Sequence, residues 1–280
     1  MAKGAVRGLV WGGLLAGLAM FGSMAVGAPA TPSAASSTFV TIDLVRPFHT
    51  ISPWRFVATQ GPSVPDPIYS EGGNIPGVVR FCVQATGAGA CDTRLAAMPA
   101  AAPSLSDLFD DAHALRDARI IYPSGPSGKP LLLLSAASMS SGDGDQVIFT
   151  QLLAYDRSRD RFEQIYAHRT GHNNNQDVRF IASGPLQGDV ISVEPMSRLP
   201  YGYWITVNRL TPDYAYRPVL HYRSATIYND GNPLAVVDSE MPNIEQRLGL
   251  WRPGQPLPVP AAGAHPCAKP HLVRMELWCS

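Results

Sequence analysis

The sequence predicts a mainly β protein made of antiparallel sheets, either a sandwich or an irregular propeller-like sheet stack, with one amphipathic helix and two local disulfides. Three observations support this fold class. Short apolar or alternating segments follow one another along most of the chain and are separated by turn-forming residues. One segment alone has the apolar spacing of a helix of several turns. The four cysteines occur as two pairs that are close in sequence.

The first 30 residues have the pattern of a secretory signal peptide. Lys3 and Arg7 precede an uncharged stretch at 8–28, and Ala28-Pro29-Ala30 has the small-x-small form that signal peptidase cleaves. An uncleaved membrane anchor is the alternative, because 21 uncharged residues are long enough to span a bilayer. Six glycines in this stretch lower its hydrophobicity and favour cleavage. A signal peptide is therefore expected at 1–30.

Charge restricts the classes of partner. The mature chain is expected to consist of a flexible lead-in at 31–37 and a single β-rich domain at 38–280. Cleavage removes two basic residues and no acidic one, so the net charge of the mature chain is about −2. Binding to nucleic acid needs a strong basic excess, so no nucleic-acid partner is expected. Contact with a membrane is expected only through the leader, if it stays uncleaved. Only three of the 22 basic residues are lysine, which is typical of GC-rich bacterial genomes.

The cysteines predict the disulfides Cys82–Cys91 and Cys267–Cys279. Each pair brackets a short segment, and an even number of cysteines in an exported chain is typical of disulfides. A zinc site with four cysteine ligands is the alternative, but the C-x2-C spacing that would support it is absent. In the chain-entropy description, a disulfide that closes a loop this short stabilises the fold by roughly 2–3 kcal/mol.

The first elements of the domain are expected to be strands. Segments 38–44 and 78–84 have the composition of strands, the first of them with clear alternation. Between them, segment 53–76 is rich in proline and glycine, which predicts irregular surface with one short strand at 55–58.

The amphipathic helix is expected after Pro103. Ser104 and Asp107 form a capping-box pattern, with aspartate in place of the usual glutamate. The apolar residues that share one helical face are Leu105, Leu108, Phe109, Ala112 and Leu115. This helix is interpreted as structural, with its apolar face packed against the core.

Beyond this helix the pattern is one strand after another. Segment 131–134 is continuously apolar, which is typical of a strand buried on both faces. Segments 147–155 and 161–169 flank a polar turn and predict a hairpin. Further strands are expected at 178–181, 190–193, 203–209, 217–224, 234–237 and 271–279, with one or two helical turns at 241–248.

A weak internal repeat has an offset of 54 residues and aligns Phe162 and Ile165 with Tyr216 and Val219. Two copies of a strand–turn–strand unit would suit propeller blades. A repeat array needs about three copies, and no third is visible, so chance similarity between two amphipathic hairpins is the other explanation.

The first candidate site is a polar segment after the predicted hairpin. Two imidazoles four residues apart and a carboxylate could bind zinc or copper, although this spacing converges on a helix and the segment reads as a loop. Amides that donate and accept hydrogen bonds equally suit a glycan or peptide, and the third interpretation is a solvated turn. The candidate ligand-binding residues are His168, His172, Asn173, Asn174, Asn175 and Gln176.

Two further loops contain candidate residues. Asp143 and Asp145 could offer oxygen ligands to calcium, with a simple turn as the alternative. Tyr201 and Tyr203 could stack on sugar rings. Strand alternation places Tyr203 and Trp204 on opposite faces, so at least one of these two side chains should lie in the core.

These patterns favour a bacterial envelope protein, periplasmic or secreted, that is a non-catalytic binding or structural module. Its expected partner is an envelope glycan or another envelope protein. No metal and no cofactor is expected, and no nucleophile elbow, H-E-x-x-H, phosphate loop or G-x-G-x-x-G follows a suitable strand. The alternative is a secreted hydrolase of an envelope glycan or peptide, with acids from Glu194, Glu240 or Asp143.

Overall fold

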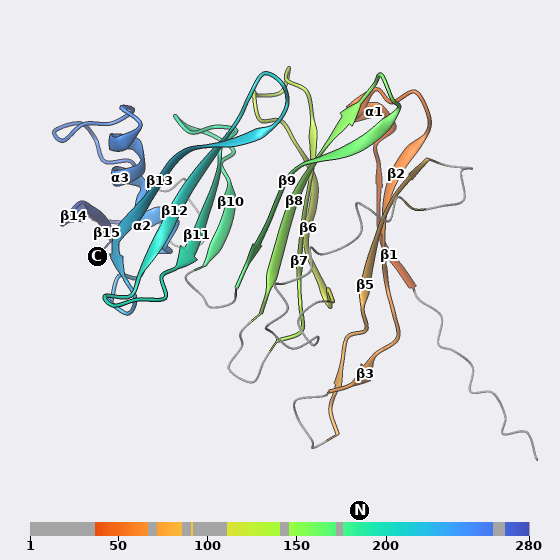
Figure 1. Ribbon diagram of the computed structural model, residues 1–280, viewed down its shortest axis with the longest axis horizontal. Coiled ribbons are helices and arrows are strands. Elements are labelled where there is room, and N and C mark those ends of the chain that lie inside the picture. Colours follow the sequence, from red (N-terminus) through yellow and green to blue (C-terminus); the bar gives the residue numbers. More distant parts are fainter. Residues whose placement is uncertain are drawn as a thin grey trace, which may run out of the picture. The chain divides into compact units, whose positions relative to one another are not determined.

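Antiparallel sheets contain about half of the described residues, and two of these sheets are four-stranded up-and-down meanders (Figure 1). The structure is a computed structural model, and it describes residues 37–66, 72–85, 91, 111–140, 146–171, 176–259 and 267–279. The expected leader and lead-in therefore lie outside the described residues, apart from Ser37. The predicted class, mainly β with antiparallel sheets, is confirmed.

The first sheet has the strand order β1-β2-β5. These strands are β1 (Ser37–Asp43), β2 (Trp54–Gln60) and β5 (Val79–Ala85). A single helical turn, α1 (Val45–Phe48), connects β1 to β2. Two residues of β3 (Val64–Pro65) pair with two of β4 (Asn74–Ile75) in the connection from β2 to β5, where proline and glycine predict irregular backbone.

The second and third sheets each follow chain order. The second sheet contains β6 (Ala114–Ile121), β7 (Leu131–Ala137), β8 (Ile148–Asp156) and β9 (Arg161–Thr170). The third contains β10 (Asp177–Phe180), β11 (Val190–Pro195), β12 (Gly202–Leu210) and β13 (Tyr216–Ile227). The hairpin expected at 147–155 and 161–169 is thus confirmed as β8–β9.

The 54-residue offset has a structural counterpart. It carries both ends of β8 onto both ends of β12, so the hairpins β8–β9 and β12–β13 hold equivalent places in their sheets. A four-stranded meander is also the form of a propeller blade. The described residues contain two sheets of this form and one three-stranded sheet.

The second sheet is buried on both faces. Leu132, Leu134 and Leu153 pack in one cluster with Phe56 and Phe81 of the first sheet. Their neighbours on the opposite face, which are Leu131, Leu133 and Leu152, pack in another cluster with Val190 of the third sheet. The run 131–134 is therefore apolar throughout because each face of β7 meets a different sheet.

The other face of the third sheet packs against two short helices, α2 (Val236–Ser239) and α3 (Met241–Arg247) (Figure 1). Ile205 and Val207 of the sheet lie in one apolar cluster with Val237 of α2 and Ile244 of α3. The C-terminal hairpin consists of β14 (Pro270–Val273) and β15 (Glu276–Cys279). Both helices also contact β15.

The two predicted disulfides, Cys82–Cys91 and Cys267–Cys279, are confirmed. The first bond is anchored in β5 and the second in β15. Helices within the described ranges are short, and none has the length and apolar character needed to cross a bilayer.

Three sequence-based element predictions need correction. The helix expected after Pro103 was predicted to extend to Leu115, and this end is wrong, because Ala114 and Leu115 begin β6 and pair with β7. The rest of the expected helix, up to residue 110, lies outside the described residues. The strand expected at 234–237 is wrong, since α2 begins at Val236. The single strand expected at 271–279 is a hairpin. Its turn residues Arg274 and Met275 both have positive φ without being glycine, so the usual turn signal is missing.

Candidate functional site

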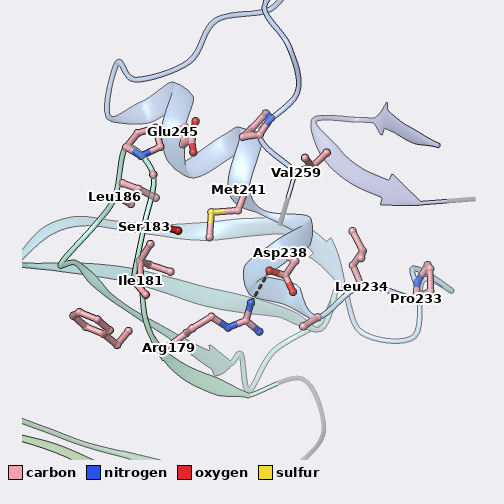
Figure 2. Close-up of a pocket in the computed structure, with 16 residues that line it drawn as sticks. Arg179, Ile181, Ser183, Leu186, Pro233, Leu234, Asp238, Met241, Glu245 and Val259 are labelled. Carbon is pink, nitrogen blue, oxygen red and sulfur yellow. Dashed lines mark hydrogen bonds and ion pairs between the residues drawn. The ribbon is translucent and has the colours of Figure 1, made fainter. Parts of the chain in front are cut away.

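A pocket of about 610 Å³ lies between the β10–β11 connection and the helices α2 and α3 (Figure 2). Its lining residues come from the segments 179–186, 233–245 and 258–259, and we call it the α2–α3 pocket. The volume is within the range of pockets that bind small molecules, which is about 300–1,000 Å³.

The β10–β11 connection forms one wall because its backbone is held at both ends. The amide of Ile181 donates to the Asp189 carbonyl (2.9 Å), and the amide of Gly188 donates to the Ile181 carbonyl (2.8 Å). Gly188 has φ of 89°, and a Cβ there would meet the Pro123 carbonyl oxygen at 2.7 Å, so only glycine fits. The Asp189 carboxylate is buried and takes two hydrogen bonds from Arg209 of β12, which fixes the end of the connection.

The wall of the pocket is mostly apolar. Leu186 and Ile181 come from the β10–β11 connection, Leu234 and Met241 from the helical side, and Val259 from the chain after α3. Leu186 belongs to the core cluster of the third sheet, and Ile181 and Met241 pack against that cluster. The part of the wall formed by Ile181, Leu186 and Met241 is therefore a continuation of a packed core, whereas Val259 is 46% exposed.

One end of the pocket carries an ion pair. Arg179 of β10 lies 2.5 Å from Asp238 of α2 and 2.9 Å from Asp177 of its own strand. Burial raises the pKa of the Asp238 carboxyl, and the adjacent Arg179 opposes this without cancelling it. The Arg179 guanidinium is thus shared by two carboxylates and holds α2 against the third sheet.

Glu245 of α3 also lines the pocket and is 8% exposed. Its side chain has no hydrogen-bond or ion-pair partner among the residues that the structure describes. Burial raises the pKa of its carboxyl group. Figure 2 shows Glu245 on the opposite side of Met241 from the Arg179–Asp238 pair.

A second polar group of side chains lies between the second and third sheets. His168 of β9 pairs with Glu194 of β11 at 2.7 Å, and this hydrogen bond lowers the pKa of the Glu194 carboxyl. On the same face of the third sheet, Trp204 stacks on His221, with ring centroids 4.9 Å apart. The His168–Glu194 pair ties the second sheet to the third, and both of its members are only partly exposed.

Most of the loop residues named from the sequence cannot be placed. Asp143, Asp145, His172, Asn173, Asn174 and Asn175 lie outside the described residues. Gln176 precedes β10, and His168 is the residue that pairs with Glu194. Within the described ranges, no three or more His, Cys, Asp or Glu side chains are grouped so that they could hold a metal ion.

The two tyrosines named from the sequence lie in different surroundings. Tyr203 is 1% exposed and belongs to the core cluster under α2 and α3, so its ring has no face open to a ligand. Tyr201 is 50% exposed and precedes β12. The expectation that Tyr203 or Trp204 lies in the core is confirmed for Tyr203.

Glu194 and Glu240 do not share a cleft. Glu240 is fully buried beside α3 and accepts a hydrogen bond from the Tyr222 hydroxyl at 2.7 Å. Tyr222 lies on the helix-covered face of the third sheet with Val193. Glu194 follows Val193 in β11 and therefore points to the opposite face.

The charged residues of the α2–α3 pocket were missed by the sequence analysis. Arg179 and Asp238 are 59 positions apart and meet only because α2 folds back on the third sheet. Glu245 lies in a helix that was predicted, but nothing in MPNIEQR distinguishes a buried glutamate from an exposed one.

Comparisons with protein-family models, curated proteins and solved structures find no match. The candidate site therefore depends on geometry alone.

Proposed function

We propose that the protein is exported from a bacterial cell, into the periplasm or beyond it, and that it binds a small ligand in the α2–α3 pocket without transforming it. The observation that carries the binding function is Glu245, a buried carboxyl group in an apolar wall with no partner among the described residues. Such a group costs folding free energy, and a bound ligand can offset that cost.

Export is supported by two independent features. Two disulfides join all four cysteines, and disulfides persist mainly in oxidising compartments. Residues 1–30 have the charge and hydrophobicity pattern of a signal peptide, with Ala28-Pro29-Ala30 as the cleavage site.

Binding is favoured over hydrolysis by the arrangement of carboxylates. A glycosidase needs two carboxyl groups that flank one bond. Glu194 and Glu240 lie on opposite faces of the third sheet. In the pocket, Asp238 is held by Arg179, so Glu245 is the one carboxyl group of the described lining that has no partner.

The test is native mass spectrometry of protein purified from the envelope fraction of a bacterium that expresses the gene with its own leader. We expect a chain that begins at Thr31, contains no free thiol and has a bound small molecule. The exposed residue Ser183 lines the pocket, so Ser183→Trp should fill it and remove the added mass.

Ser197→Trp, at an exposed serine in the β11–β12 connection, is the matched control and should keep the ligand. Retention of the ligand by Ser183→Trp, or no bound molecule in any of the three proteins, would contradict the binding function. An intact Met1 with four titratable thiols would contradict export.

A further inference from the structure

The charges that line the α2–α3 pocket are unbalanced. Within the described lining, Arg179 is the cation, and Asp238 and Glu245 are the carboxylates. The guanidinium of Arg179 is already taken up by Asp238 and, outside the lining, by Asp177. Among the described residues, Glu245 therefore has no counter-charge when it is ionised.

Glu240, five positions earlier, shows how this fold treats a buried carboxylate that has a structural role. Its side chain accepts four hydrogen bonds, from the Tyr222 hydroxyl (2.7 Å), the Thr226 amide (2.8 Å), the Thr226 hydroxyl (2.9 Å) and the Asn243 side-chain amide (3.1 Å). Glu245 has no such donors in the described chain and faces a pocket. The donors that it lacks are those that a ligand can bring.

The rest of the lining specifies the remainder of the ligand. Aliphatic or thioether groups are presented by Ile181, Leu186, Leu234, Met241 and Val259. An alkyl or aryl group of a ligand can contact them without any polar group being removed from water. Opposite charge next to a desolvated carboxylate stabilises its ionised form, so a cationic group gains most beside Glu245.

We propose, on the basis of the binding function proposed above, that the α2–α3 pocket selects small organic cations. The cationic group, a primary ammonium or a guanidinium, lies against the Glu245 carboxylate, and an apolar body lies along Leu186, Met241 and Val259. The Arg179–Asp238 pair closes the opposite end and holds α2 in place.

The experiment is calorimetric titration of the mature protein with three probes of equal chain length, all below their aggregation concentrations: octylammonium, 1-octanol and octanoate. We expect octylammonium to bind at least tenfold more tightly than 1-octanol, and octanoate to bind most weakly. In Glu245→Gln, which keeps the shape of the side chain and removes its charge, the preference for octylammonium should disappear.

Glu163→Gln is the matched control, because Glu163 is a partly exposed carboxylate already paired with Arg159 and Arg161. It should keep the full preference for octylammonium. The cation inference is overturned if Glu245→Gln keeps this preference or if 1-octanol binds the wild type as tightly as octylammonium.

Ser183→Trp separates the two proposals. If 1-octanol and octylammonium bind equally and both are lost in Ser183→Trp, the pocket binds ligands and only the cation selectivity is wrong. If none of the three probes binds the wild type, the inferred ligand class is wrong, and the binding function depends on the mass-spectrometric test alone.

Discussion

At the scale of single residues, Glu240 and Glu245 are two buried glutamates with opposite surroundings, the first at the N-cap of α3 and the second within that helix. Glu240 is 0% exposed, and four donors surround its carboxylate. Glu245 has no partner within the described residues, and burial alone raises its pKa. The hydrogen bonds of the first group therefore stabilise the fold, whereas burial without a partner makes the ionised form of Glu245 unfavourable.

The substitution of each by glutamine should separate these roles. In Glu240→Gln the amide nitrogen meets donors where an acceptor is needed, so the free energy of unfolding should fall by about 3 kcal/mol. In Glu245→Gln a desolvated charge is removed, so stability at pH 7 should be unchanged or higher. Urea denaturation of both variants measures the difference. Equal losses would mean that Glu245 has an undetected structural partner.

At the scale of elements, the hairpin β14–β15 is attached to α2 through the side chain of Asn232. Asn232 donates from its side-chain amide to the Leu277 carbonyl (3.0 Å) and to the Ser239 hydroxyl (3.0 Å). Glu276, the first residue of β15, is buried near Asp230 and Glu240. Desolvation, together with these two negative groups, raises the pKa of Glu276 to about 7.

This shift predicts a pH dependence of stability. A carboxyl group with a raised pKa binds its proton more tightly in the folded state, so its contribution is complete below about pH 4.5 and is lost as the pH rises to about 7. The loss should be roughly 2 kcal/mol, allowing for solvent screening.

Glu276→Gln cannot ionise, so its free energy of unfolding should lack this loss. The measurement is the difference between wild type and variant in urea denaturation at several pH values from 4 to 8. A difference that stays constant over this range would show that Glu276 does not titrate near neutral pH.

At the scale of the whole molecule, the second sheet is shared by two cores. Leu152 and Leu153 are adjacent in β8 and almost fully buried, but Leu153 packs with the first sheet and Leu152 with the third. Unfolding of either core would therefore expose one face of the second sheet, which couples the two cores.

Leu152→Ala and Leu153→Ala should each lower the free energy of unfolding by about 3 kcal/mol, because each leaves a cavity in a packed layer. Both variants should unfold in one transition that is shared by the near-ultraviolet and far-ultraviolet circular dichroism signals. Separate transitions in either variant would show that the cores fold independently.

The β8–β9 turn illustrates what sequence alone cannot show. Its polar residues, Asp156 to Asp160, predict a turn, and a turn is present. Yet Asp160 accepts hydrogen bonds from Ser52, from Trp54 Nε1 (2.9 Å) and from the Tyr155 hydroxyl (2.5 Å). Burial opposes them, but together these bonds lower its pKa to about 2. An aspartate that fastens the first sheet to the second has the same local sequence signal as a solvated one.

The sequence by itself determined the properties that depend on local pattern. Alternation and turn residues predicted most strands, and the spacing of cysteines predicted both disulfides, because each signal acts over a few residues. The predicted end of the helix is wrong, since pairing with β7 places Leu115, the last residue of the expected helical face, in a strand. Only the tertiary structure decided which glutamate is surrounded by donors and which faces a pocket, because burial and charge pairing depend on segments that are distant in the chain.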